Sequence, residues 1–218
     1  MFIIAYGYVA DSVRARRDQL VLVQQKTEAE LTALKAQVNP HFLFNALNTI
    51  YNEAQRAGNE SVADLIQQLA GLMRYTLEES GRPLTPVENE LQFLEKYVAL
   101  QRARLPQTDA LRLTVRLEGD GQPAFIAPLL LIPFVENAFQ YGISLTHPSC
   151  IDIDVVVENK QLRMRVANGR LPGGPAKSGA GTGIANVRQR LARTYPARHD
   201  LHLTQTDTSF VVTLRIDL

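Results

Sequence analysis

The sequence predicts an α+β protein in which a helical N-terminal part precedes an α/β sandwich, and three observations support this. Residues 12–38 contain neither glycine nor proline and repeat apolar side chains every three or four positions. Residues 61–105 add two more amphipathic helical segments. After Pro106 the pattern changes to strands of period two, such as "LRLTVRLEG", "IDIDVVVE" and "QLRMRVAN", with helical segments between them.

Composition and charge exclude several classes of protein. The chain has 218 residues, of which 45% are hydrophobic and 21% charged, which is typical of a soluble globular protein. Its formal net charge is only +1, so we expect no direct binding to nucleic acid. Cys150 is the only cysteine, which excludes a disulfide within the chain and argues against a cysteine-based metal site.

The first residues, "MFIIAYGYVA", are apolar and are followed by the basic stretch "DSVRARR". A helix needs about 20 apolar residues to cross a bilayer, and a signal peptide carries its basic region first. We therefore expect residues 1–10 to be the end of a membrane helix whose earlier part is missing. The chain would then be the soluble remainder of a longer membrane protein, on the cytoplasmic side of the inner (plasma) membrane. The alternative is a short helix packed on the domain.

Residues 11–106 are expected to form a coiled coil and a helical-hairpin dimerisation bundle. The coiled coil is predicted from a stripe with loose heptad spacing, formed by Leu20, Val23, Thr27, Leu31, Leu34 and Val38. Pro40 should kink the helix, which continues to about Arg56 before a break at Gly58 and Asn59. Helices are predicted over 61–79 and 87–105, and their apolar stripes require partners.

Residues 107–218 are expected to form the sandwich, with helices covering one face of a mixed sheet. A strand over 111–119 precedes a helix that opens after Pro128, "PLLLIPFVENAFQYGI". Two strands joined by a turn at 158–160 follow. The loop "GRLPGGPAKSGAGTG" then leads into the helix "IANVRQRLARTY" and a closing hairpin.

Two features of this second part suggest chemistry. Glu136 and Asn137 interrupt an apolar helix, which costs free energy unless they have partners. They could also be an ordinary hydrogen-bond network at a helix terminus. The segment "SGAGTGIANVRQRL" places small residues before a helix, as in a phosphate cradle, although surface loops are often glycine-rich. It matches neither a Walker A loop nor a Rossmann fingerprint.

Taken together, "LLLIPFVENAFQYG", the hairpin ending "VANG", the loop and "GTGIANVRQRL" resemble the ATP-binding fold shared by histidine kinases, gyrase, Hsp90 and MutL. The resemblance implies ATP and Mg²⁺ as cofactors, with Asn137 as the Mg²⁺ ligand and Glu136 as its catalytic neighbour. It also implies that the nucleotide is bound by Tyr141, Asn168, Gly179, Gly181, Thr182, Gly183, Ile184 and Asn186.

The segment "LKAQVNPHFLFNALNTI" resembles the phosphoacceptor region of LytS-type sensor histidine kinases, and the resemblance continues in order through most of the chain. It implies that His41 is the phosphoacceptor, since a neutral imidazole is available near pH 7. Asn45, one helical turn on, could orient the ring. Phe42 stands where many histidine kinases have an acidic residue, so the proton acceptor stays open. The alternative is that His41 has only a structural role at a kink in the helix.

The implied function is ATP-dependent autophosphorylation on His41 within a homodimer, followed by phosphotransfer to an aspartate of a response-regulator receiver domain. One departure from the family's sequence pattern supports an alternative function. The family's adenine-binding Asp is replaced by Asn168, and a neutral hydrogen bond contributes about 1 kcal/mol against roughly 2 for a charged one. We therefore expect nucleotide binding to be about tenfold weaker. The rival is a non-catalytic dimeric signalling scaffold with a degenerate nucleotide site.

Overall fold

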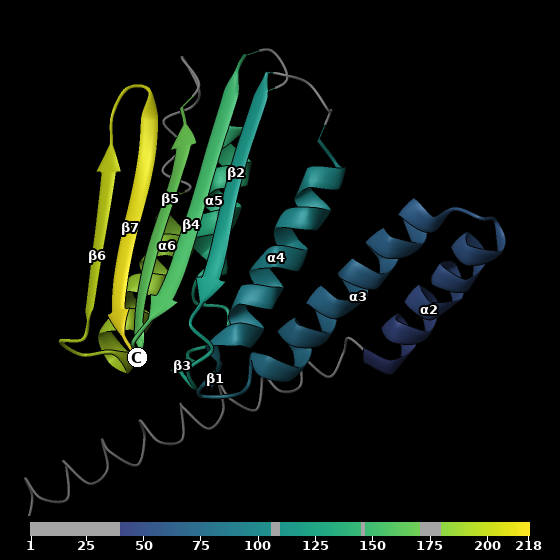
Figure 1. Cartoon of the computed structure of the whole chain (residues 1–218), viewed down its shortest axis with the longest axis horizontal. Helices are drawn as coiled ribbons and strands as arrows, with labels where there is room; N and C mark the ends of the chain where they lie inside the picture. Colours follow the sequence, from purple (N-terminus) through teal and green to yellow (C-terminus); the bar gives the residue numbers. More distant parts are fainter. Residues whose placement is uncertain (1–39, 106–109, 145–146, 171–179) are drawn as a thin grey trace, which may run out of the picture. The chain divides into compact units, whose positions relative to one another are not determined.

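The computed structural model describes residues 40–105, 110–144, 147–170 and 180–218 (Figure 1). The chain divides into two units, residues 1–49 and 50–218. The predicted membrane-helix end, the coiled coil and Gly179 lie outside the described residues. Within the described ranges, no helix is both long and apolar enough to span a bilayer.

The described elements confirm the α+β class. The helices are α2 (Pro40–Arg56), α3 (Glu60–Glu79), α4 (Val87–Ala103), α5 (Ile132–Gly142) and α6 (Ala180–Thr194). The strands are β1 (Thr85–Pro86), β2 (Leu111–Gly119), β3 (Phe125–Ile126), β4 (Ser149–Glu158), β5 (Gln161–Gly169), β6 (His199–Gln205) and β7 (Ser209–Asp217).

The break between α2 and α3 follows from two local residues. Gly58 has a φ of +68°, and its N–H and that of Asn59 donate to the carbonyls of Gln55 and Ala54. This is the usual glycine-terminated helix end. The Asn59 side chain then accepts from the N–H of Val62 at 3.2 Å and caps α3.

A buried carboxylate connects α3, α4 and the turn that precedes α5. Glu90 on α4 is fully buried and accepts a hydrogen bond from the Tyr75 hydroxyl of α3 at 2.6 Å. It also accepts from the backbone N–H groups of Leu129 at 2.8 Å and Leu131 at 3.1 Å. Burial raises the pKa of Glu90, and these donors oppose that rise.

The large sheet is mixed, as predicted, with the strand order β2-β4-β5-β7-β6. β2 runs parallel to β4, and the other neighbours are antiparallel. The predicted turn between β4 and β5 is confirmed as a two-residue connection. Asn159 and Lys160 both have positive φ, which suits the right-handed twist of a hairpin.

The two faces of this sheet differ sharply. One face contributes the core, and α5 and α6 both cover it (Figure 1). Its buried side chains alternate along the strands and include Ile151, Ile153, Val155, Leu162, Met164, Val166, Val212, Leu214 and Ile216. Burying each such side chain contributes about 1.5–3 kcal/mol, so this face supplies much of the domain's stability.

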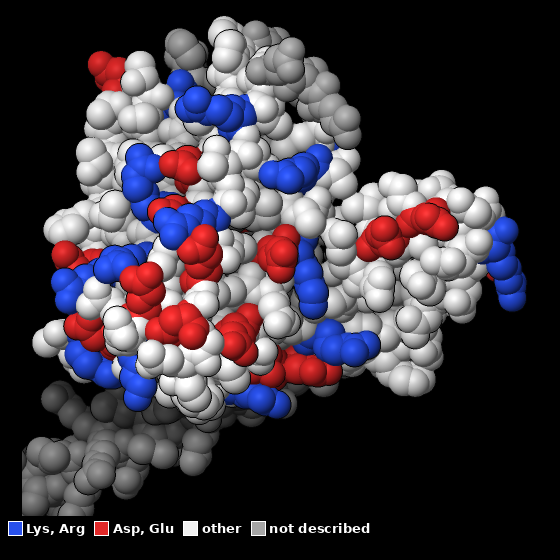
Figure 2. Space-filling model, in the orientation of Figure 1, with Lys and Arg blue, Asp and Glu red and all other residues white. Residues whose placement is uncertain are grey.

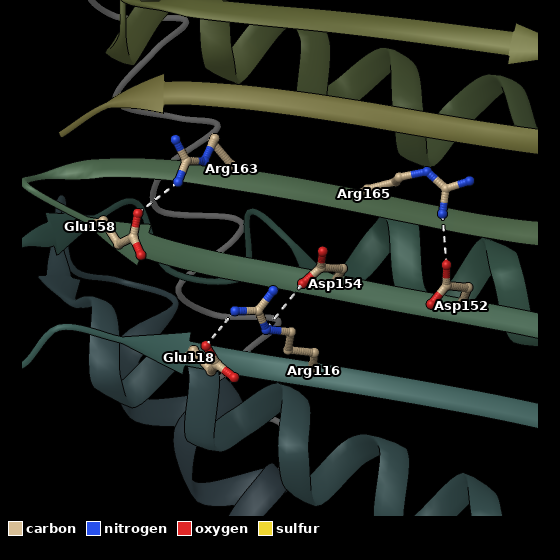
Figure 3. Close-up of polar contacts among 7 residues, drawn as sticks. All are labelled: Arg116, Glu118, Asp152, Asp154, Glu158, Arg163 and Arg165. Carbon is tan, nitrogen blue, oxygen red and sulfur yellow. Dashed lines mark hydrogen bonds and ion pairs between the residues drawn. The ribbon is translucent and has the colours of Figure 1, made fainter.

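The opposite face is charged, with Lys and Arg intermingled with Asp and Glu (Figure 2). Three arginines each have a carboxylate at 2.7 Å (Figure 3): Arg116 with Glu118, Arg163 with Glu158, and Arg165 with Asp152. Exposed pairs of this kind contribute only about 0–1 kcal/mol each. Their main effect is that the positive and negative charges on this face of the sheet balance one another.

Two sequence-based boundaries were wrong, and one pair of strands was not predicted. The helix expected after Pro128 begins at Ile132, because Leu129 has a φ of +56° while its N–H donates to Glu90. The last helix begins at Ala180 rather than Ile184, so part of the expected loop is helical. The short antiparallel pair β1 and β3 was not predicted.

Candidate functional site

The predicted phosphoacceptor segment lies at the start of α2. His41 is exposed, and the Asn45 Nδ2 atom lies 3.2 Å from His41 Nδ1. A helix places residues four apart on the same face, which explains the pairing. The Asn45 carbonyl in turn accepts from the Thr49 hydroxyl at 2.9 Å. The kink expected at Pro40 involves preceding residues that lie outside the described ranges.

The amide of Asn45 controls which nitrogen of the ring has an available lone pair. If Nδ2 donates to Nδ1, the proton of a neutral ring sits on Nε2. If the amide turns over, Oδ1 accepts from Nδ1–H and the lone pair of Nε2 becomes available. The two orientations of an amide differ only by rotation about its last torsion. The orientation of the Asn45 amide therefore decides which nitrogen of a neutral His41 ring carries the proton.

The predicted Mg²⁺ ligand lies in the middle of α5. Asn137 is 9% exposed, whereas its neighbour Glu136 is exposed. Tyr141, one turn further on, is half-buried. Pro133 lies in the first turn of the helix, where a missing N–H costs little.

Glu136 lines a hollow of about 520 Å³ together with Tyr97, Gln101 and Arg104 of the α4 segment. Asn137 is not among the described residues that line it. Partial desolvation raises the pKa of Glu136, and burial and the charge of Glu136 raise the pKa of Tyr97. The structure therefore does not bring the two polar residues of the predicted motif to one common hollow.

Asn168 has an incomplete set of hydrogen bonds. The residue is 3% exposed on β5, and its Nδ2 donates to the carbonyl of Gly169 at 2.9 Å. Its Oδ1 is buried and has no hydrogen-bond partner in the described structure. A buried acceptor without a donor costs about 1–3 kcal/mol. Asn168 is thus suited to accept a hydrogen bond from a ligand.

Gly142 fixes the distance between the end of α5 and Asn168. A Cβ added at Gly142 would lie 2.6 Å from Asn168 Cβ and 3.2 Å from Ile151 Cγ1. Only glycine permits so close an approach of the helix to β4 and β5. No motif in the sequence predicts this role for Gly142.

The remaining predicted nucleotide residues lie in the first turns of α6. Gly181 and Thr182 belong to this helix, Gly183 and Asn186 are exposed, and Ile184 is buried in the core. The first N–H groups of a helix have no partners within it and favour anions. The start of α6 therefore offers donors to a phosphate.

The structure thus brings Asn168 next to Gly142, and it pairs His41 with Asn45. His41 belongs to one unit and the predicted nucleotide residues to the other. The Tyr75–Glu90 connection was missed. Its signal is that Glu90 occupies a position of the buried α4 stripe formed by Val87, Leu91, Leu94 and Val98.

The chain is similar to known proteins in its sequence. A family model described as "Histidine kinase" matches residues 29–108. Sensor protein LytS of Bacillus subtilis (strain 168) is 34% identical over 208 residues, which cover 86% of this chain and 34% of the relative. LytS of Staphylococcus haemolyticus (strain JCSC1435) is 30% identical over 203 residues, 87% of this chain and 34% of the relative.

Among solved structures, the "Histidine kinase domain from Erythrobacter litoralis EL346 blue-light activated histidine kinase" gives a TM-score of 0.46 at 17% identity. The match covers 83% of this chain and 86% of that one.

The sequence matches define the class: this chain is a homologue of the sensor histidine kinases. The two relatives named above are LytS sensor proteins, which confirms the resemblance seen in the sequence. The chain spans about a third of the length of these curated relatives, 34% in both cases.

Proposed function

We propose that this chain is the kinase core of a two-component sensor that phosphorylates itself on His41 with ATP and passes the phosphoryl group to an aspartate of a receiver domain. The homology to LytS sensor proteins supports this class. The observation that carries the proposal is the unpartnered, buried Oδ1 of Asn168. It could accept the hydrogen bond that the adenine amine donates in related ATP-binding domains.

The residues present fit ATP with Mg²⁺. Asn137 can offer one amide oxygen, and the described residues contain no group of three or more His, Cys, Asp or Glu side chains placed to hold a metal alone. Mg²⁺ is commonly held by few protein oxygens together with substrate phosphates and water. Asn137 would hold the ion together with the nucleotide, and the ion would neutralise charge on the phosphates.

On this proposal, the donors at the start of α6 bind phosphate oxygens, and Tyr141, Gly181, Thr182, Gly183, Ile184 and Asn186 shape this part of the site. His41 forms a nitrogen–phosphorus bond while the bond between the γ-phosphorus and the bridging oxygen of ADP breaks. We propose that the Asn45 amide, which lies 3.2 Å from Nδ1, turns its Oδ1 toward the ring and accepts a hydrogen bond from Nδ1–H, so that Nε2 presents its lone pair. Glu136 is exposed and lies in the same helix as Asn137. We propose that it is a catalytic neighbour that acts from its own hollow.

The proposed partners are a second copy of this chain and a receiver domain. Helices α2 and α3 leave several large apolar side chains exposed: Phe42, Ile50, Val62 and Leu69. Such side chains are suited to a dimeric bundle. We further propose that residues 11–106 serve dimerisation and phosphotransfer and that residues 107–218 bind ATP. A preceding segment would attach the chain to the cytoplasmic side of the membrane.

Incubation with Mg-ATP labelled at the γ-phosphate tests the proposal. We expect label on the wild type and none on His41→Gln, with ATP binding retained in the variant. Absence of label on the wild type, together with no ATP binding by calorimetry, would support the non-catalytic scaffold instead. Binding of ATP by the wild type without label on His41 would also contradict the proposed acceptor.

A further inference from the structure

A hollow of about 600 Å³ lies where the linker after α3, the β4–β5 turn and the end of α6 meet. Its lining includes five cationic side chains: Arg82, Lys160, Arg190, Arg193 and Arg198. It also includes the apolar side chains Leu84 and Phe125. We call these seven residues and the hollow that they line the basic groove.

The charged side chains that line the basic groove are all cationic. Its lining contains no Asp or Glu side chain, although the whole chain carries a net charge of only +1. On the outer face of the sheet, by contrast, Arg116, Arg163 and Arg165 each have a carboxylate at 2.7 Å (Figure 3). The outer face of the sheet therefore pairs these arginines with carboxylates, whereas the lining of the basic groove contains cationic side chains and no acidic ones.

The five cations differ in how strongly they are already engaged. Arg82 pairs with Glu79 at 3.3 Å, Arg190 donates to the Pro128 carbonyl at 2.6 Å, and Arg198 lies over the Tyr195 ring. These contacts hold three of the side chains in position.

Lys160 and Arg193 have neither an ion pair nor a side-chain hydrogen bond within the described ranges. A cluster of cationic side chains attracts acidic groups and repels basic ones. These two side chains therefore remain available for carboxylates of a partner.

The apolar residues define the ligand further. Leu84 is 44% exposed and Phe125 is 53% exposed, so each offers a large apolar area beside the cations. A small inorganic anion would leave this area in water. A flat bilayer surface cannot follow a hollow. An extended polypeptide can place acidic side chains against the cations of the groove and apolar side chains against Leu84 and Phe125.

We propose that the basic groove binds an acidic polypeptide segment of a partner protein that also carries an aromatic or aliphatic side chain. The carboxylates contact Lys160 and Arg193, and the apolar side chain covers Leu84 and Phe125. This surface shares no residue with the proposed nucleotide and phosphoacceptor sites. It is therefore an additional interaction site that does not depend on catalysis.

The test measures the affinity of the 218-residue chain for a fluorescently labelled random copolymer of glutamate and tyrosine. The groove variant is Lys160→Asn/Arg193→Gln, in which Asn suits the positive φ at position 160. The matched control is Arg102→Gln/Arg188→Gln, which removes two exposed arginines outside the groove lining. All variants are checked by circular dichroism and thermal unfolding.

We expect the groove variant to bind the copolymer at least about tenfold more weakly than the wild type, and the control to bind within about twofold. Added salt should weaken the binding. Leu84→Ser/Phe125→Ser should lower the affinity for the copolymer but not for polyglutamate. Equal binding by the wild type and the groove variant would overturn the proposal. So would binding of phosphatidylglycerol vesicles that depends on Lys160 and Arg193 while copolymer binding does not.

Discussion

The Tyr75 hydroxyl donates a hydrogen bond of 2.6 Å to Glu90 Oε2 and so joins α3 to α4. The same carboxylate accepts from the backbone N–H groups of Leu129 and Leu131 immediately before α5. One buried group therefore links a helix of the proposed dimerisation part to the turn that starts the proposed metal-binding helix. Tyr75 also stacks on Phe93, with ring centroids 4.7 Å apart, which fixes the direction of its hydroxyl.

Tyr75→Phe should destabilise the fold, because it removes one donor from a buried carboxylate and leaves the rest of the ring in place. Loss of a hydrogen bond to a charged group costs about 1.5–3 kcal/mol. We expect a fall of this size in the free energy of unfolding, measured by urea denaturation. Tyr51→Phe is the control, since within the described part of the chain the Tyr51 hydroxyl has a 3.4 Å contact with Gln55 at the surface and no other hydrogen bond. Equal effects of the two substitutions would contradict this role for Glu90.

Glu90 should also make stability depend on pH. Burial raises its pKa above the ordinary value of 4.5, so the native state binds the proton more tightly than the unfolded state. Its contribution to stability is then full below about pH 4.5 and is lost as the pH rises through the folded pKa.

Residue 90 cannot titrate in the Glu90→Gln variant. As the pH rises, the free energy of unfolding of the wild type should therefore fall relative to that of the variant. Urea denaturation from about pH 4.5 to 8 measures this difference. Glu88→Gln, an exposed change on the same helix, should show no such trend. A constant difference for Glu90→Gln across this range would show that burial does not govern the titration.

Gly142→Ala should disturb both stability and nucleotide binding. The new methyl group would lie 2.6 Å from Asn168 Cβ, so the helix or the strand must move. Overpacking of this kind costs about 1–3 kcal/mol. We expect a lower midpoint of thermal unfolding and weaker ATP binding by calorimetry. Gly81→Ala meets nothing within 4 Å and should change neither quantity.

Asn45→Ala should slow labelling of His41 without weakening ATP binding, because it removes only the contact that orients the ring. Loss of one such hydrogen bond corresponds to about a tenfold lower rate. The rate is measured with γ-labelled ATP at saturating concentration. Asn48→Ala, an exposed asparagine of the same helix, should leave the rate unchanged. If both variants label at the wild-type rate, Asn45 does not orient His41.

Elements governed by local chemistry were predictable from the sequence. The break at Gly58 and Asn59 and the turn before Gln161 depend on residues that favour positive φ or cap a helix, and both were confirmed. The start of α5 was not predictable, because Leu129 takes its conformation while donating to Glu90, which lies 39 positions earlier. The β1–β3 pair likewise depends on contacts between distant residues.

The site shows the same division. The pairing of His41 with Asn45 follows from helical spacing and was expected. The role of Gly142 was not visible, since the space around it is set by β4 and β5. The sequence predicts Asn168 only as a weaker substitute for Asp. Its Nδ2 donates to the Gly169 carbonyl, a bond that a carboxylate could not make, so the amide has a structural role of its own.

β2 and β4 are neighbours that run in the same direction, and α5 lies in the stretch of chain that returns from the end of one to the start of the other. The proposed metal-binding helix is therefore also the covalent bridge between two adjacent strands. Its side chains also belong to the core that the sheet buries, so selection for an intact sheet would preserve this helix whether or not the chain phosphorylates itself.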